Sequence, residues 1–149
     1  PSSPPVPEEG AIFCSQDDLR NCKGLAIGSP TRFGNMSAPL KYFIDCTGSI
    51  WASGDLINKP FVTFTSSNSL HGGQESTLLT MSIPMLHHGM IYCGIPFSEP
   101  SLSRTRTGGS PYGATHFTGS NDNLEISKDE SDSCIALGKR LAHLSERLM

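Results

Sequence analysis

The chain has 149 residues and a formal net charge of −3 at pH 7. This length predicts one domain that buries roughly two-thirds of its unfolded surface. The charge argues against nucleic-acid binding, which needs a basic patch, and no apolar run reaches the roughly 20 residues of an integral membrane segment.

The five cysteines are widely spaced and include no CxxC pair. An odd number without a metal-ligand spacing predicts free thiols and a cytoplasmic protein, with neither a disulfide framework nor a zinc site. We also expect no metal at His71, His87 and His88, because adjacent histidines on a helix diverge and no carboxylate or cysteine sits at ligand spacing.

The chain opens with four prolines in its first seven positions. Such a segment forms neither helix nor interior strand, so residues 1–9 are predicted to be a Pro-rich linker and residues 10–149 the domain. Either the mature protein starts with a disordered segment or the chain is the later part of a larger fold, and we expect the fold to be N-terminally incomplete.

Strands and helices then alternate along the chain. A short helix or turn is predicted over residues 17–22 and a buried strand over 24–28. A helix is predicted from Asn35 to about residue 48, capped by Asn35 or Ser37.

The second half continues the alternation. A strand over residues 61–65 precedes a polar loop at 66–73, and a helix over about 75–88 is interrupted by Pro84 and ended by Gly89. A strand follows over residues 90–95.

Residues 97–126 are long and irregular, and a capping box from Ser127 to Glu130 opens a final helix. A core stripe on that helix comprises Cys134, Leu137, Leu141, Leu144 and Leu148. The alternation predicts an α/β fold, a doubly wound parallel sheet with helices on both faces. Only three strands are convincing, which would leave a sheet edge uncovered.

The most informative stretch is GSPTRFGN at residues 28–35, between a buried strand and a helix. Open α/β sheets build ligand sites at this kind of junction. Its hydroxyls, arginine, aromatic ring and amides suit a flat, polar, anionic group, so we interpret it as one wall of a flavin pocket. The alternative is an ordinary turn before a capped helix.

Five motifs occur in order along the chain: GSPTRFGNM at 28–36, GSIWASG at 48–54, HGGQE at 71–75, HHGM at 87–90 and GGSPYGA at 108–114. Together they closely resemble the tryptophan-repressor-binding-protein (WrbA) family of flavodoxin-like NAD(P)H:quinone oxidoreductases, from about Gly10 to Leu148. The family's first strand, phosphate-binding loop, helix and second strand have no counterpart in this sequence. In the family, that part includes the main binding loop for the FMN phosphate and a tyrosine of the nicotinamide site.

The resemblance implies two FMN-binding loops and a histidine that reaches the flavin from a neighbouring subunit. The first loop comprises Pro30, Thr31, Arg32, Phe33, Gly34 and Asn35. The second comprises Ser66, Ser67, Asn68, Ser69, Leu70 and His71, and the histidine is His87. An arginine at the ring edge suits the negative charge of a reduced flavin. The alternatives are a solvated polar loop and a histidine favoured by its position at a helix C-terminus.

Trp51, the only tryptophan, matches a family residue that stacks over the open face of the flavin and so binds substrate. Its alternative role is a core or interface anchor. The family insertion with Tyr112 is expected to build subunit contacts, and the resemblance implies a homotetramer.

The implied activity is FMN-dependent NAD(P)H:quinone oxidoreduction, a two-electron reduction of quinones by a ping-pong hydride mechanism with no catalytic side chain. Quinone use would allow a cytoplasmic protein to associate peripherally with a membrane. Two alternatives stay open, a flavodoxin-type electron carrier and a non-catalytic regulatory or scaffold protein. Without the phosphate loop, we expect weak or absent flavin binding by the 149-residue chain.

Overall fold

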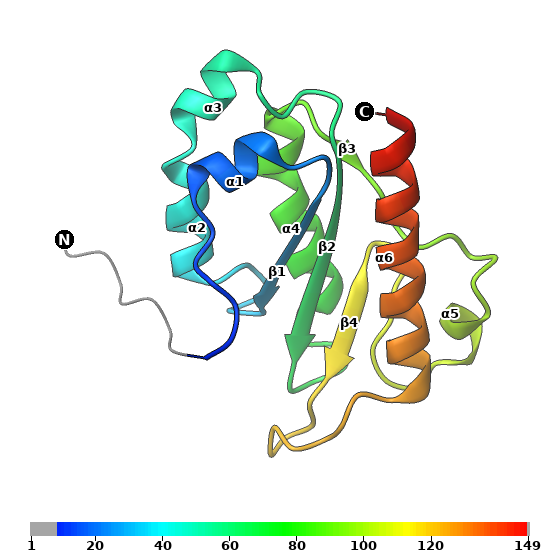
Figure 1. The fold of residues 1–149 in the computed structure, drawn as a ribbon. Helices are drawn as coiled ribbons and strands as arrows, with labels where there is room; N and C mark the ends of the chain where they lie inside the picture. Colours follow the sequence, from blue (N-terminus) through cyan, green and yellow to red (C-terminus); the bar gives the residue numbers. More distant parts are fainter. Residues whose placement is uncertain (1–8, 149) are drawn as a thin grey trace.

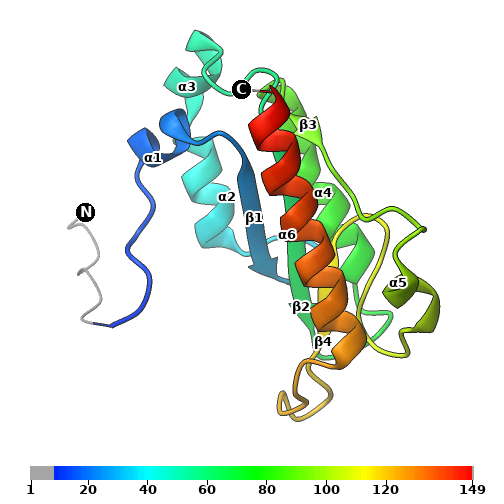
Figure 2. The same cartoon turned by 45° about the vertical axis from the view of Figure 1, so that its right-hand side comes forward.

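The computed structural model describes residues 9–148, so the predicted linker lies outside the described residues except for its last position. Four parallel strands form one sheet, with α4 (Gln74–His87) on one face and α6 (Lys128–Leu148) on the other (Figures 1 and 2). The predicted α/β class and doubly wound parallel sheet are therefore confirmed. Among residues 9–148, none of the helices has the length and apolar character needed to cross a bilayer.

The sheet is built around β2 (Pro60–Ser67), which pairs with neighbours on both sides. On one side lies β1 (Leu25–Pro30), in a register that places Pro30 opposite Ser66. Since β1 and β2 end at the same level, the loops that follow them leave the sheet side by side.

The other edge of β2 carries two short strands, β3 (Ile91–Tyr92) and β4 (Ala114–Phe117). They act as halves of one edge strand, separated by residues 93–113. The prediction of a strand over 90–95 was too long, because the Ile95 N–H donates to Pro111 O and no longer to the sheet. The sequence prediction missed β4 because it lies inside a segment read as irregular.

The predicted helix over residues 35–48 was wrong in its bounds. Helix α1 (Gln16–Asn21) forms as predicted, but the next helix is α2 (Ala38–Asp45), followed by a separate α3 (Gly48–Ser53). Asn35 instead closes a tight turn with Arg32, and the N–H of Ser37 donates to the Ser29 hydroxyl at 2.8 Å. These contacts delay the start of α2.

Pro84 does not interrupt α4, contrary to the prediction. Proline inside a helix costs about 3 kcal/mol. Here it is flanked by Met81 and Met85, which are both buried, and each contributes about 1.5–3 kcal/mol through that burial. The helix then ends at Gly89, whose φ of 76° is the expected left-handed conformation.

The insertion carries one short helix, α5 (Pro100–Arg104), which packs against α6. The predicted stripe on α6 is core only in its middle part. Leu137 is buried and Leu141 and Leu144 pack on its cluster, but Cys134 and Leu148 are exposed. All five cysteines are free, as predicted.

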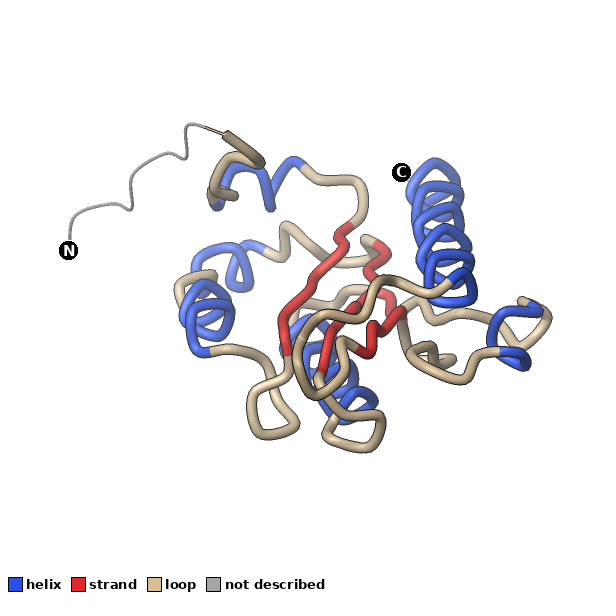
Figure 3. The backbone as a smooth tube through the Cα atoms, turned by 90° about the horizontal axis from the view of Figure 1, so that it is seen from below, coloured by secondary structure: helices blue, strands red, loops and turns tan. Residues whose placement is uncertain are grey.

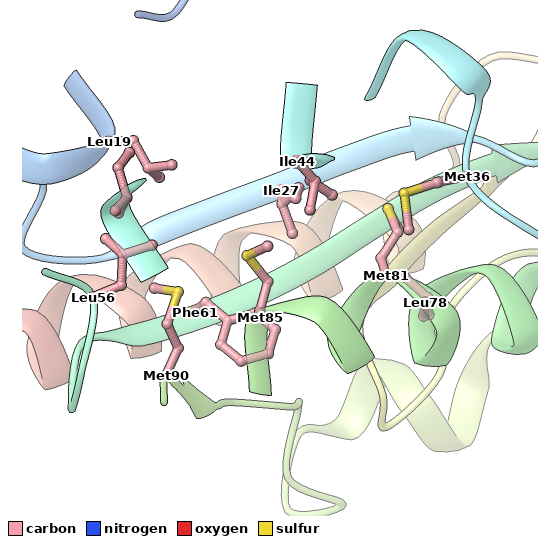
Figure 4. Close-up of a cluster of buried hydrophobic side chains, with 11 residues drawn as sticks. Leu19, Ile27, Met36, Ile44, Leu56, Phe61, Leu78, Met81, Met85 and Met90 are labelled. Atoms are coloured by element: carbon pink, nitrogen blue, oxygen red, sulfur yellow. The ribbon is translucent and has the colours of Figure 1, made fainter. Parts of the chain in front are cut away.

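Successive residues of β2 point to opposite faces and into two cores. Phe61 belongs to the larger core, between the sheet and helices α2 and α4 (Figure 4). Val62 belongs to the smaller core beneath α6. Burial on both faces of the sheet at Phe61 and Val62 suits a strand that lies between helices.

Candidate functional site

Three segments converge where β1, β2 and β4 end (Figure 3). They enclose a cleft of about 590 Å³. Its lining comprises Pro30, Thr31, Arg32, Phe33, Ser66, Ser67, Asn68, Gly72, Thr118 and Asp122. The structure thus brings together part of each predicted wall and adds a third wall at Thr118 and Asp122. Of the first predicted wall, Gly34 and Asn35 are not among the lining.

The first wall is a tight two-residue turn. Arg32 and Asn35 exchange backbone hydrogen bonds of 2.7 and 3.0 Å, and the residues between them have positive φ, 53° at Phe33 and 75° at Gly34. This is the pattern of a type I′ turn, which favours Asn-Gly. Phe33 adopts it although phenylalanine rarely does, and its ring is fully exposed. Strain of this kind concentrates at functional sites.

Two contacts fix the first wall against α4. The Thr31 hydroxyl lies 2.7 Å from the hydroxyl of Thr77, which is fully buried. Gly73, at the start of α4, has a φ of 109°, and a Cβ there would come within 2.6 Å of Gly34 Cα. Only glycine allows this approach, and the Thr31 hydroxyl ties the loop to α4.

The second wall follows β2. The Ser67 hydroxyl donates to Ser69 O at 2.7 Å, which closes the loop on itself. Asn68 and Gly72 line the cleft. The predicted residues Ser69, Leu70 and His71 are not among its lining, and all three are exposed.

The third wall was missed in the sequence. The N–H of Thr118 donates to Ser67 O at 2.9 Å, and its hydroxyl donates to Asp122 Oδ1 at 2.6 Å. The available signal was the Ala-Thr-His-Phe run at 114–117, an apolar and β-branched stretch between two glycine-rich segments.

Glu130 holds the base of the third wall. Its buried carboxylate accepts the N–H groups of Gly108, Phe117 and Ser127 at 2.7–2.9 Å. Burial alone would raise the pKa of Glu130, but these N–H groups outweigh it and the pKa lies below its ordinary value. A charged, fully bonded carboxylate therefore joins β4, the insertion and α6.

Trp51 and His87 lie at the other end of the sheet. The indole Nε1 of Trp51 donates to His87 O at 2.9 Å. Helix α4 runs from Gly73, beside the first wall, to His87, and at 1.5 Å per residue its 14 residues span about 20 Å. Figure 1 shows α3, which carries Trp51, at the opposite end from the arrowheads of β1, β2 and β4. Within one copy, these two residues are therefore remote from the cleft.

A groove of about 560 Å³ lies beside Trp51 and His87, between α2, α3 and α4. His88, at its floor, is buried, and its Nε2 lies 2.8 Å from the Thr47 hydroxyl. That hydroxyl donates to Ile44 O at 2.6 Å, so His88 Nε2 carries the proton. Burial, and then the neighbouring His87, lower the pKa of His88.

The cleft suits the ring system of a flavin. It offers an exposed aromatic ring at its lip and hydroxyl and amide groups from Ser66 and Asn68 for hydrogen-bonding edges. Among the described residues that line it, Arg32 carries the only positive charge and Asp122 the only negative charge. The set therefore fits the ring and gives little hold on a phosphate.

Comparisons with known proteins agree with this geometry. A sequence profile described as NADPH-dependent FMN reductase matches residues 15–98. A protein of Solidesulfovibrio magneticus named NAD(P)H dehydrogenase (quinone) is 41% identical over 137 residues, covering 91% of this chain and 68% of that protein. One of the same name from Chromohalobacter salexigens is 41% identical over 140 residues, covering 93% and 70%.

A solved structure described as the flavodoxin, WrbA-like protein from Agrobacterium tumefaciens matches with a TM-score of 0.68. The match covers 97% of this chain and 80% of that one at 23% identity, which supports the fold. The profile and the sequence relatives show the family. The chain belongs to the NADPH-dependent FMN reductase family and, within it, to the family of the proteins named NAD(P)H dehydrogenase (quinone).

Proposed function

We propose that this chain is an FMN-dependent NAD(P)H:quinone oxidoreductase that reduces quinones by two electrons. The observation that carries the proposal is the convergence of the 30–35 turn and the 66–68 segment on one polar cleft with an exposed, strained Phe33 at its lip. Relatives at 41% identity are named for this reaction. When bound, FMN supplies the redox chemistry, since it takes up a hydride from NAD(P)H and gives two electrons to a quinone.

The residues of the cleft would hold and tune the ring. The Arg32 side chain is exposed apart from a 2.9 Å hydrogen bond to Thr31 O, so its guanidinium is free to face a ring edge that gains negative charge on reduction. Phe33 offers a flat apolar surface for a planar group. Ser66 and Asn68 supply hydrogen bonds along the ring edges, and no side chain needs to act as a nucleophile.

Trp51 and His87 serve this reaction from another copy of the chain. In one copy about 20 Å of α4 separates them from the cleft. The outer face of α4 is apolar at positions i, i+4 and i+7, with Leu79, Ile83 and Leu86 all exposed. A helix face of this kind favours burial against a partner. We therefore place the substrate-binding Trp51 of one copy over the cleft of another, within a homotetramer.

This arrangement lets NAD(P)H and quinone use one place in turn, which is a ping-pong mechanism. The flat Trp51 indole would orient either ring and exclude water from one face of it, while the hydrogen bond to His87 O holds the indole in place. Initial rates measured at several quinone concentrations should give parallel double-reciprocal lines.

The test is oxidation of NAD(P)H by the purified chain with benzoquinone and added FMN. We expect a rate that requires both additions and that falls at least about tenfold in Arg32→Ala, the loss of one charge-assisted contact. Arg106→Ala, an exposed arginine outside the cleft, is the matched control and should keep the rate. Flavin binding without NAD(P)H oxidation would favour the electron carrier, and no flavin binding at all would favour a scaffold.

A further inference from the structure

Gln74, the first residue of α4, is a buried polar side chain with only 3% of its surface exposed. Its Oε1 accepts a hydrogen bond of 2.7 Å from the Thr115 hydroxyl, and its Nε2 donates one of 2.9 Å to the Ser67 hydroxyl. The amide therefore bridges Thr115 of β4 and Ser67 at the end of β2.

Each of these hydroxyls also has a second partner. Thr115 Oγ1 accepts the N–H of Gly109 at 2.6 Å, and Ser67 Oγ donates to Ser69 O at 2.7 Å. The bonds therefore run in one direction from Gly109 to Ser69. Turning the Gln74 amide over would leave the Thr115 proton without an acceptor, so the orientation of the amide is fixed by its neighbours.

The last bond of this series shapes the second wall of the cleft. Ser69 lies between the lining residues Asn68 and Gly72, and a Cβ at Gly72 would come within 1.9 Å of Ser69 Oγ. The loop is thus packed tightly on itself. The Ser67 hydroxyl has one proton, and because Gln74 Nε2 donates to its oxygen, that proton is directed to Ser69 O.

We propose that Gln74 is a positioning residue of the flavin site, which holds the 67–72 loop in its binding shape through Ser67. This inference rests on the proposed function for its consequence on flavin binding. Gln74 also connects the second wall to residues 108–113. The Gly109 N–H donates to the Thr115 hydroxyl, which in turn donates to the Gln74 amide. Gln74 itself does not line the cleft.

The test uses Gln74→Glu, which keeps the shape and replaces the donor with an acceptor. The Ser67 proton would then turn to the carboxylate and release Ser69 O. We expect hydrogen exchange of the 68–73 amides to speed up about threefold to tenfold, and FMN to dissociate more readily by a similar factor. The amides of the 31–35 turn should stay unchanged.

The pH profile separates positioning from a merely structural role. Once protonated, the carboxyl group introduced by Gln74→Glu again has a donor for Ser67. The loop and the flavin affinity of the variant should therefore recover as pH falls, whereas the wild-type chain should not change in this way. Both hydrogen-bond partners of this side chain, Ser67 and Thr115, are uncharged.

Two further comparisons keep the inference testable if Gln74→Glu folds poorly. Thr115→Val should loosen the 68–73 loop, and Thr115→Ser, which keeps the hydroxyl, should restore it. In a Ser67→Ala background the Gln74→Glu effect on the loop should disappear, since the route through Ser67 is already broken.

Uniformly faster exchange across the sheet in Gln74→Glu, or an effect that persists in Ser67→Ala, would overturn the inference. If the wild-type chain binds no flavin at any FMN concentration, the proposed function fails instead. The exchange measurements need no flavin, so they still decide whether Gln74 holds the loop.

Discussion

The indole Nε1 of Trp51 and the carbonyl oxygen of His87 are joined by a hydrogen bond of 2.9 Å, across 36 positions of sequence. This bond links α3 to the last turn of α4. It joins two residues that are far apart in the sequence into one surface. Because that surface lies at the far end of α4 from the cleft, the proposed function needs a second copy of the chain to bring the two parts together.

Subunit mixing tests that composite site. Trp51→Ala and Arg32→Ala should each lose quinone reductase activity, because each removes one half of every site. After unfolding and refolding together, the mixture should regain activity, since some sites then join an intact Trp51 surface to an intact Arg32 cleft. Steady-state rates of the mixture and of each variant refolded alone provide the comparison. A mixture as inactive as its components would contradict a site shared between copies.

Phe33→Asn should stabilise the fold and weaken flavin binding. Asparagine adopts positive φ more readily than phenylalanine, so relief of strain should raise the free energy of unfolding by about 1 kcal/mol. Loss of the ring should weaken flavin binding, measured by quenching of FMN fluorescence. Phe97→Asn is the control, because Phe97 is exposed without a positive φ and should show neither effect.

Glu130→Gln should destabilise the fold. The amide cannot accept all three N–H groups that the carboxylate now binds, and each buried donor left unpaired costs about 1–3 kcal/mol. Because the pKa of Glu130 is lowered on folding, its contribution is present above the unfolded value near 4.3 and is lost as pH falls through the folded value. Urea unfolding at neutral and acidic pH measures both effects. The exposed Glu125 gives the control, Glu125→Gln, which should unfold like the wild type.

His88 should make the fold sensitive to mild acid. Its pKa is lowered on folding, so the unfolded chain takes up a proton more readily than the folded one. The contribution of His88 to the free energy of unfolding should therefore be fully present above about pH 6.5 and should decline as pH falls below that value. His88→Gln should flatten this decline, whereas His143→Gln, at an exposed position, should keep it. An unchanged slope in His88→Gln would show that the decline comes from other groups.

Flavin binding by this chain should depend little on the phosphate. Since Arg32 is the only cation among the described residues that line the cleft, FMN and riboflavin should bind weakly, with dissociation constants within about tenfold of each other. Equilibrium titration by fluorescence gives both constants. Stoichiometric FMN in the purified protein, together with much weaker riboflavin binding, would contradict the prediction.

The sequence was sufficient to predict those elements whose signals lie in residues adjacent along the chain. The Phe-Val-Thr-Phe-Thr run at 61–65, the capping box at Ser127 and the glycine at Gly89 each predicted the position of an element or its end that the structure contains. The 28–35 motif also predicted a ligand wall at the end of a strand, where the structure places the cleft.

The tertiary structure decided what depends on distant partners. Pro84 stays within α4 because Met81 and Met85 are buried beside it, and β4 is a strand because β2 offers it an edge. The continuity of α4 through Pro84 has no local signal, and β4 has only the short run at residues 114–117.

The sequence by itself determined the class of fold, the strands that pack on both faces and the chemistry of the first wall, since these follow from local patterns of apolar and hinge residues. Only the tertiary structure decided that Thr118 and Asp122 complete the cleft and that Trp51 and His87 lie about 20 Å from it. Such distances depend on how elements far apart in the chain pack together, which no short stretch of sequence encodes.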